Sequence, residues 1–156
     1  MGSQSKNHLA YIAGFLDGDG SLMLQIKKRK DGNKSNYRFM ATLCFYQDSR
    51  HEKPLFWIQK VLNIGYLSKR KDGISELRIN GFKQIERILN NLLPFIKFKK
   101  IQAKILLKSV ISLQKHLKEK DLRILVNNIV QIQSENYISK KKRTKEELLK
   151  VLGLTP

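Results

Sequence analysis

The sequence predicts an α+β domain in which helices cover one face of a single antiparallel sheet. Four segments alternate apolar and polar residues, which is the period-2 pattern of half-buried strands. Asp31-Gly32-Asn33 and Asp72-Gly73 separate these segments in pairs, as the turns of β-hairpins do. Segments with helical periodicity precede, separate and follow the pairs. The predicted order is therefore α-β-β-α-β-β-α, followed by C-terminal helices.

Each element has a sequence signal in the order of the chain. The first helix is a run of apolar and small residues, and Pro54 suits the first turn of the helix between the hairpins. The predicted helices span 8–18, 53–62, 82–92, 98–116, 119–134 and 144–152, and the predicted strands span 21–29, 37–47, 64–71 and 74–80. No linker or repeat divides the chain, so we expect a single domain over 1–156. Residues 1–7 are expected to be disordered or vector-derived, and 109–156 to form a helical C-terminal extension.

The composition is strongly basic. The chain has 31 Lys and Arg residues against 13 Asp and Glu, a formal net charge of +18 and a pI near 10.1. Such an excess repels itself, so it indicates a polyanionic partner, foremost nucleic acid. We expect no membrane partner, because no apolar run is long enough to span a bilayer and no signal peptide is visible. The single Cys44 forms no internal disulfide, which favours an intracellular, reducing location.

The predicted strands give the sheet one apolar face and one polar face with a basic bias. A twisted antiparallel ribbon fits the major groove of DNA, where each base pair presents a distinct pattern of donors and acceptors. A face that is merely solvated is the alternative, but Gln, Arg and Ser can bond base edges and Met can pack against them. The residues expected to contact DNA are Met23, Gln25, Lys27, Arg29, Arg38, Met40, Ser68, Arg70, Glu76 and Arg78.

Residues 12–20 join a small-residue helix to two acids between glycines. Ala10, Gly14 and Gly18 recur every four residues and form one bare stripe, along which a second helix can approach closely. Asp17 and Asp19 stand at the helix C-terminus, where the helix dipole disfavours negative charge. Acids in that position are candidates for metal binding or catalysis. The alternative is an ordinary buried helix that ends in a Gly-rich turn.

The segment Ile12-Ala13-Gly14-Phe15-Leu16-Asp17-Gly18-Asp19-Gly20 resembles the LAGLIDADG motif of homing endonucleases. Leu9-Ala10-Tyr11 before it and Ser21 after it are also similar to that family. The resemblance implies the homing endonuclease fold, with the antiparallel sheet as a DNA-binding saddle. It also implies cleavage of both strands of a long, pseudo-palindromic DNA site with Mg²⁺, whose place Mn²⁺ or Ca²⁺ can take.

The motif occurs once, so the chain resembles the homodimeric branch of the family. The implied partners are double-stranded DNA and a second copy of the chain. A symmetric dimer presents the same patch from both subunits, and packing of the motif helices would bring the two Asp19 side chains together at the two-fold axis. The residues expected at the dimer interface are Ala10, Ala13, Gly14, Asp17 and Gly18.

The resemblance implies the site residues. Asp19 corresponds to the metal ligand, and the Gly18 carbonyl lies near the metal. Gln47 and Lys99 correspond to catalytic residues: a Gln can orient the attacking water, and a Lys can offset charge on the phosphate. Plain phosphate binding is the alternative role of Lys99. One further basic residue joins this network, and the sequence does not choose among Arg50, His51 and Lys53.

Other expectations stay open beside this one. Asp17 is expected to be structural, accepting hydrogen bonds at the helix–helix junction. The basic run Lys140, Lys141, Lys142, Arg143 and Lys145 is expected to contact phosphates. An intron RNA maturase or a non-cleaving DNA-binding regulator is an alternative function, in which Asp19 is dispensable. The family's usual biology, intron mobility, implies an organelle (mitochondrion or chloroplast) or a prokaryotic or archaeal cytoplasm.

Overall fold

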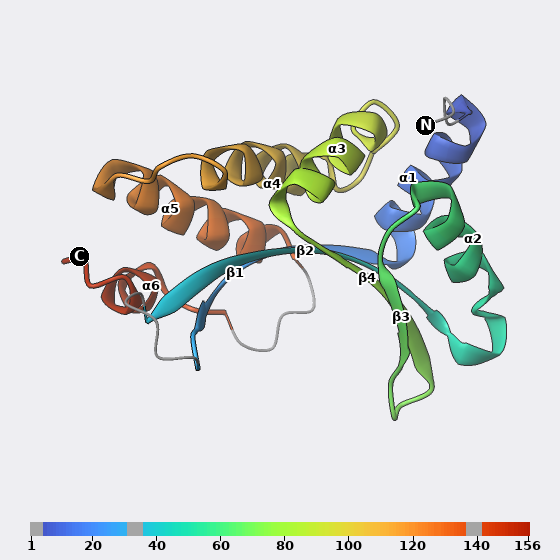
Figure 1. Cartoon of the computed structure of the whole chain (residues 1–156), viewed down its shortest axis with the longest axis horizontal. Coiled ribbons are helices and arrows are strands. Elements are labelled where there is room, and N and C mark those ends of the chain that lie inside the picture. Colours follow the sequence, from blue (N-terminus) through green and yellow to red (C-terminus); the bar gives the residue numbers. More distant parts are fainter. Residues whose placement is uncertain (1–4, 31–35, 137–141) are drawn as a thin grey trace.

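Four antiparallel strands form one sheet in the order β1-β2-β4-β3, and helices pack on one of its faces (Figure 1). The computed structural model describes residues 5–30, 36–136 and 142–156. The strands are β1 (Gly20–Lys28), β2 (Tyr37–Asp48), β3 (Tyr66–Lys69) and β4 (Ile74–Asn80). The helices are α1 (Lys6–Asp19), α2 (Lys53–Leu62), α3 (Phe82–Leu92), α4 (Lys100–Leu113), α5 (Glu119–Glu135) and α6 (Lys145–Val151), with a 3₁₀ turn at Ser49–His51. The predicted α+β class is confirmed.

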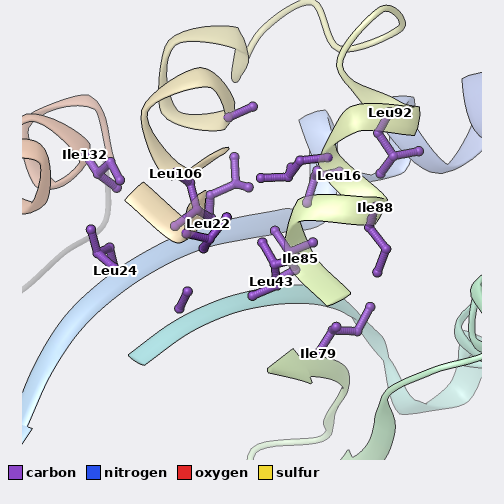
Figure 2. Packing of buried hydrophobic residues seen from close by; sticks show 14 of the residues in the cluster. Leu16, Leu22, Leu24, Leu43, Ile79, Ile85, Ile88, Leu92, Leu106 and Ile132 are labelled. Atoms are coloured by element: carbon purple, nitrogen blue, oxygen red, sulfur yellow. The ribbon is translucent and has the colours of Figure 1, made fainter. Parts of the chain in front are cut away.

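The core lies between the sheet and helices α3, α4 and α5. Figure 2 shows Leu22 and Leu43 of the sheet pointing toward Leu106 and Ile85 of the helices, and all four side chains are buried. Each such side chain contributes about 1.5–3 kcal/mol when it leaves water. The apolar half of the strand alternation therefore fixes the fold and leaves the other half of each strand on the opposite face.

Several predicted boundaries are wrong by a few residues. Helix α1 begins at Lys6, because the Ser5 side chain accepts a hydrogen bond from the His8 N–H (3.2 Å) and caps the helix. Residues 6 and 7 are therefore helical rather than disordered. Residues 109–113 form the end of α4, the helix predicted over 98–116. Helix α5 buries Leu125 and Ile129 in the same core as the sheet. The turn at Asp31-Gly32-Asn33 lies outside the described residues.

Helix α1 passes directly into β1 at Gly20. A Cβ atom on Gly20 would lie 2.6–2.8 Å from the Leu16 side chain and backbone, which is closer than real Cβ contacts allow. Only glycine fits this junction, and it fixes Asp19 at the end of the sheet. None of the described helices is both long and apolar enough to cross a membrane.

Candidate active site and DNA-facing surface

Hydrogen bonds connect the C-terminus of α1 to residues 97–99, the segment that leads into α4. The Asp17 carboxylate accepts three backbone hydrogen bonds, from the N–H groups of Lys97 (2.7 Å), Phe98 (3.1 Å) and Lys99 (2.9 Å). Burial of Asp17 favours its neutral form, but the three donors outweigh burial and hold its pKa below the usual value. These three bonds give Asp17 a structural role within its own subunit, where it joins the end of α1 to the segment before α4.

The Lys99 side chain in turn forms hydrogen bonds to the end of α1. Its Nζ donates to the carbonyl oxygens of Leu16 (2.9 Å) and Asp17 (2.8 Å), two of the last carbonyls of α1. A cation at this end of a helix is favoured by the dipole. Burial lowers the pKa of the Lys99 ammonium, while the charges of Asp17 and Asp19 act in the opposite direction. Lys99 is therefore held rigidly beside the motif acids.

We expect Asp17→Asn to destabilise the fold by about 1–2 kcal/mol at pH 7, because a neutral amide accepts hydrogen bonds more weakly than a carboxylate. The folded-state pKa of Asp17 lies below that of the unfolded chain, so its contribution is present above about pH 4 and is lost as pH falls through the folded value. Urea unfolding should show a smaller difference between variant and wild type at pH 3 than at pH 7. An equal difference at both pH values would contradict this account. The exposed Glu146→Gln serves as the control.

Asp19 and Gly18 occupy the last turn of α1, and both are exposed. The Asp19 carboxylate is close enough to Lys99 to influence its pKa. Backbone carbonyls in the last turn of a helix point out of its end, and this gives Gly18 an oxygen in the same region. Among the described residues, no three His, Cys, Asp or Glu side chains gather as a possible metal site.

Gln47 lies near the same end of the sheet. Gly20, the first residue of β1, pairs with Phe45 of β2. Gln47 lies two residues beyond Phe45 along β2, level with the end of α1. Its side-chain oxygen accepts a hydrogen bond from the Asp48 N–H (2.9 Å), which fixes the amide. The structure thus brings the three predicted catalytic residues to one end of the sheet from three separate elements: Asp19, Gln47 and Lys99.

The three candidate basic residues have different surroundings. Arg50 donates from Nε and Nη2 to the Asp48 carboxylate (3.0 and 2.7 Å), and these bonds hold the pKa of Asp48 well below its usual range. His51 is exposed at the end of the 3₁₀ turn. Lys53 starts α2 and lines an open hollow of about 480 Å³ beside Tyr11 and Trp57. Arg50 is therefore the candidate whose side chain is anchored at the end of β2.

The strand register gathers the predicted DNA-contacting side chains on one face. Side-chain rows run across the sheet, and the row that crosses all four strands joins Ser21, Cys44, Arg78 and Tyr66. Figure 1 shows α3, α4 and α5 above the opposite face. The other rows on this face are Tyr46-Glu76-Ser68, Met23-Thr42-Asn80, Gln25-Met40 and Lys27-Arg38.

The alternation of side chains along the strands also identifies residues on this face that the prediction left out. Tyr46 lies on this face and its hydroxyl is hydrogen-bonded to that of Ser21 (2.9 Å). Asn80 accepts a hydrogen bond from the Thr42 hydroxyl (2.8 Å), and Tyr66 is half exposed. Counting every second residue from Met40 and from Glu76 would have included Thr42, Tyr46 and Asn80.

Two predicted arginines lie beyond the strands. Arg70 follows β3 and forms an ion pair with Asp72 in the turn (2.6 Å). Arg29 follows β1 and lines a hollow of about 670 Å³ between the end of the β1–β2 hairpin and α6. Arg143 lines the same hollow and donates to the Ile26 carbonyl (3.1 Å), so part of the predicted C-terminal basic run lies at this end of the sheet. Lys140 and Lys141 lie outside the described residues.

A sequence model of the family described as LAGLIDADG endonuclease matches residues 12–102, more than half of the chain. This chain belongs to the LAGLIDADG endonuclease family. The matched region begins in α1 and ends in α4, so it contains the motif, the whole sheet and all three catalytic candidates. The predicted family and fold are confirmed, and with them the enzyme class of DNA endonuclease.

Two DNA endonucleases of green algae are similar to this LAGLIDADG endonuclease. I-CvuI of Chlorella vulgaris is 36% identical over 101 residues, which span 65% of this chain and 62% of I-CvuI. I-CreI of Chlamydomonas reinhardtii is 30% identical over 153 residues, which span 95% of this chain and 90% of I-CreI. The crystal structure of I-CvuI with its DNA target and Ca²⁺ superposes with a TM-score of 0.81 at 29% identity, covering 97% of this chain and 98% of that one. I-CvuI has also been solved with the I-CreI target and Mg²⁺, with the DNA uncleaved.

The LAGLIDADG helix α1 presents the predicted stripe of small residues to solvent. Ala10, Gly14 and Gly18 are exposed, and a Cβ atom on either glycine would meet nothing within 4 Å. Ala13 is fully buried in the core, so its prediction as an interface residue is wrong. Tyr11, which the prediction omitted, is half exposed beside the stripe.

Proposed function

We propose that this LAGLIDADG endonuclease acts as a homodimer that cuts both strands of a long, near-palindromic DNA site with a divalent metal. One observation carries the proposal: Asp19, Lys99 and Gln47 lie at the same end of a sheet whose uncovered face is polar and basic. Chemistry and base contact would then share one surface.

Dimerisation through α1 completes the site. A two-fold axis beside the exposed stripe would place one α1 against its copy, with the glycines permitting close approach. Each subunit contributes one exposed Asp19 at the end of this helix, and the second copy doubles the carboxylates there. A symmetric dimer also presents two identical sheet faces, so the target is expected to consist of two similar half-sites.

The exposed Asp19 carboxylates suit Mg²⁺, which binds one or two carboxylates and takes further oxygens from water and substrate phosphates. The Gly18 carbonyl would add a protein oxygen. When bound, Mg²⁺ supplies positive charge to the phosphate and activates water for attack. I-CvuI, solved with DNA in the presence of Mg²⁺ or Ca²⁺, supports a divalent metal for this chain.

Lys99 and Gln47 have defined tasks beside this site. The Lys99 ammonium has three donors and uses two on the α1 carbonyls, so the third is available to a phosphate oxygen. Because those carbonyls fix Nζ, its charge is placed in advance where the phosphate gains charge. The Gln47 oxygen is held by the Asp48 N–H, which leaves the amide NH₂ to orient a water molecule. Arg50, anchored by Asp48, is our choice for the further basic residue.

The experiment is a cleavage selection on a randomised DNA library in Mg²⁺, with Ca²⁺ in a parallel reaction. We expect discrete double-strand cuts in one family of near-palindromic sites in Mg²⁺. Tight, specific binding without cutting in Mg²⁺ or Mn²⁺ would instead favour a regulator, and preference for structured intron RNA would favour a maturase. A search for the selected site in organellar, prokaryotic and archaeal genomes would then identify the host compartment.

A further inference from the structure

We infer that Arg78 reads a guanine in the inner part of each DNA half-site and that Glu76 positions it for this contact. The inference rests on the proposed function, because it assigns one base contact to the face that would bind DNA. It assigns different roles to two residues that the sequence analysis placed in one group of DNA-contacting side chains.

Arg78 lies in the row of the sheet face that crosses all four strands, one row beyond that of Tyr46, Glu76 and Ser68 at the motif end. It pairs with Cys44, which pairs with Ser21, two residues after Asp19. Lys27, at the outer end of the same face of β1, is six residues further along the strand. At about 3.3 Å per residue, the inner and outer rows lie about 20 Å apart, or about six base-pair steps. Arg78 would therefore meet bases in the inner part of the half-site, and Lys27 would meet bases toward its outer end.

The Glu76 side chain lies deeper in the sheet face than the Arg78 side chain. Arg78 Nη2 donates to Glu76 Oε1 (3.1 Å), and the same oxygen is 3.5 Å from the Ser68 hydroxyl across the strand. The Glu76 side chain is only 12% exposed, whereas that of Arg78 is 26% exposed. The carboxylate thus lies deeper in the face and holds the guanidinium from below.

This arrangement suits a base and not a phosphate. A guanidinium has five donors, and a pair of them matches the O6 and N7 acceptors of guanine in the major groove. Glu76 offsets the charge of Arg78, so Arg78 would gain little from a phosphate. The carboxylate itself repels phosphates, which favours the middle of the groove for the pair. Arg38 has no such acid partner among the described ion pairs, and it suits phosphate contact better.

The test is a binding selection in Ca²⁺ on half-site libraries, with wild type and variants compared base by base. Wild type should prefer G at one inner position of each half-site. Arg78→Gln should reduce that preference by about 10-fold or more and favour A at that position only, because Gln pairs with adenine. Lys27→Gln, the matched variant in the outer row, should change only an outer position. If Arg78→Gln does not fold, Arg78→Lys gives the same test, since one ammonium cannot pair with both acceptors.

Glu76 has a separate signature. Glu76→Gln should weaken the preference for G and free the charge of Arg78 for phosphates, so the log–log salt slope should steepen by about 0.9 per subunit. Glu76→Asp keeps the charge and should restore the wild-type slope, which a purely structural role of Glu76 would not predict. An unchanged base profile in Arg78→Gln, or an equal loss for all sequences, would overturn this inference alone. A wild type without any sequence preference would overturn the proposed function as well.

Discussion

We expect Asp19→Asn to abolish cleavage and to leave DNA binding intact. Asn has the shape of Asp but a neutral oxygen, a much poorer ligand for Mg²⁺. We expect the rate of cleavage to fall by about 10³-fold or more, which corresponds to the several kcal/mol that metal catalysis supplies. The stability of the fold should change little, because the helix dipole disfavours the Asp19 charge while the nearby Lys99 ammonium favours it.

Single-turnover cleavage of the selected site and thermal unfolding measure the two effects of Asp19→Asn together. Glu146→Gln, a change in another exposed acid on α6, should retain cleavage. A loss of activity accompanied by a loss of stability would point to misfolding. A cleavage rate within about tenfold of wild type would show that the Asp19 charge is not a metal ligand.

We expect Gly14→Leu to yield a folded monomer that does not cut DNA. A side chain at Gly14 meets no other part of the subunit, and replacing an exposed helical glycine gains about 0.8–1 kcal/mol of helix propensity. In the dimer, the same side chain stands between the two copies of α1. Overpacking costs about 1–3 kcal/mol at each of two symmetry-related positions, so the dissociation constant of the dimer should rise by about 10²-fold or more.

Light scattering over a range of concentrations measures the dimer, and circular dichroism checks the fold of the subunit. Lys104→Leu on α4 places the same side chain at an exposed helical position away from the stripe, and it should remain dimeric and active. If Gly14→Leu stays dimeric and cuts normally, the two subunits meet elsewhere.

Much of the fold follows from local signals. The spans of α2 and α3 agree with prediction, because Pro54 and Gly81 mark their first turns and each has a clear apolar stripe. The start of α1 was missed although Ser5 is a good capping residue, because the signal is a single hydroxyl. β3 is shorter than predicted, since Gly65 adopts a positive φ of 101° just before it.

The site was only partly predictable. The motif alone identifies Asp19, but Asp17 accepts from backbone groups about eighty residues away in sequence, and no local pattern encodes such a contact. The burial of Ala13 could have been predicted from its position in the helix, because Ile12, Ala13 and Leu16 share the side of α1 that faces the core. Alternation along β4 places Glu76 and Arg78 on one face, but the hydrogen bond between them and the depth of each side chain are seen only in the structure.

The uneven burial of the sheet's polar face bears on how such an enzyme could acquire new genomic targets. Cys44 and Thr42 lie on this face near the motif and are buried, so substitutions there carry a stability penalty. Gln25 and Lys27 are exposed and support little of the core, so changes there alter recognition at small structural expense. Drift in target preference should therefore begin at the ends of the site and reach its centre last.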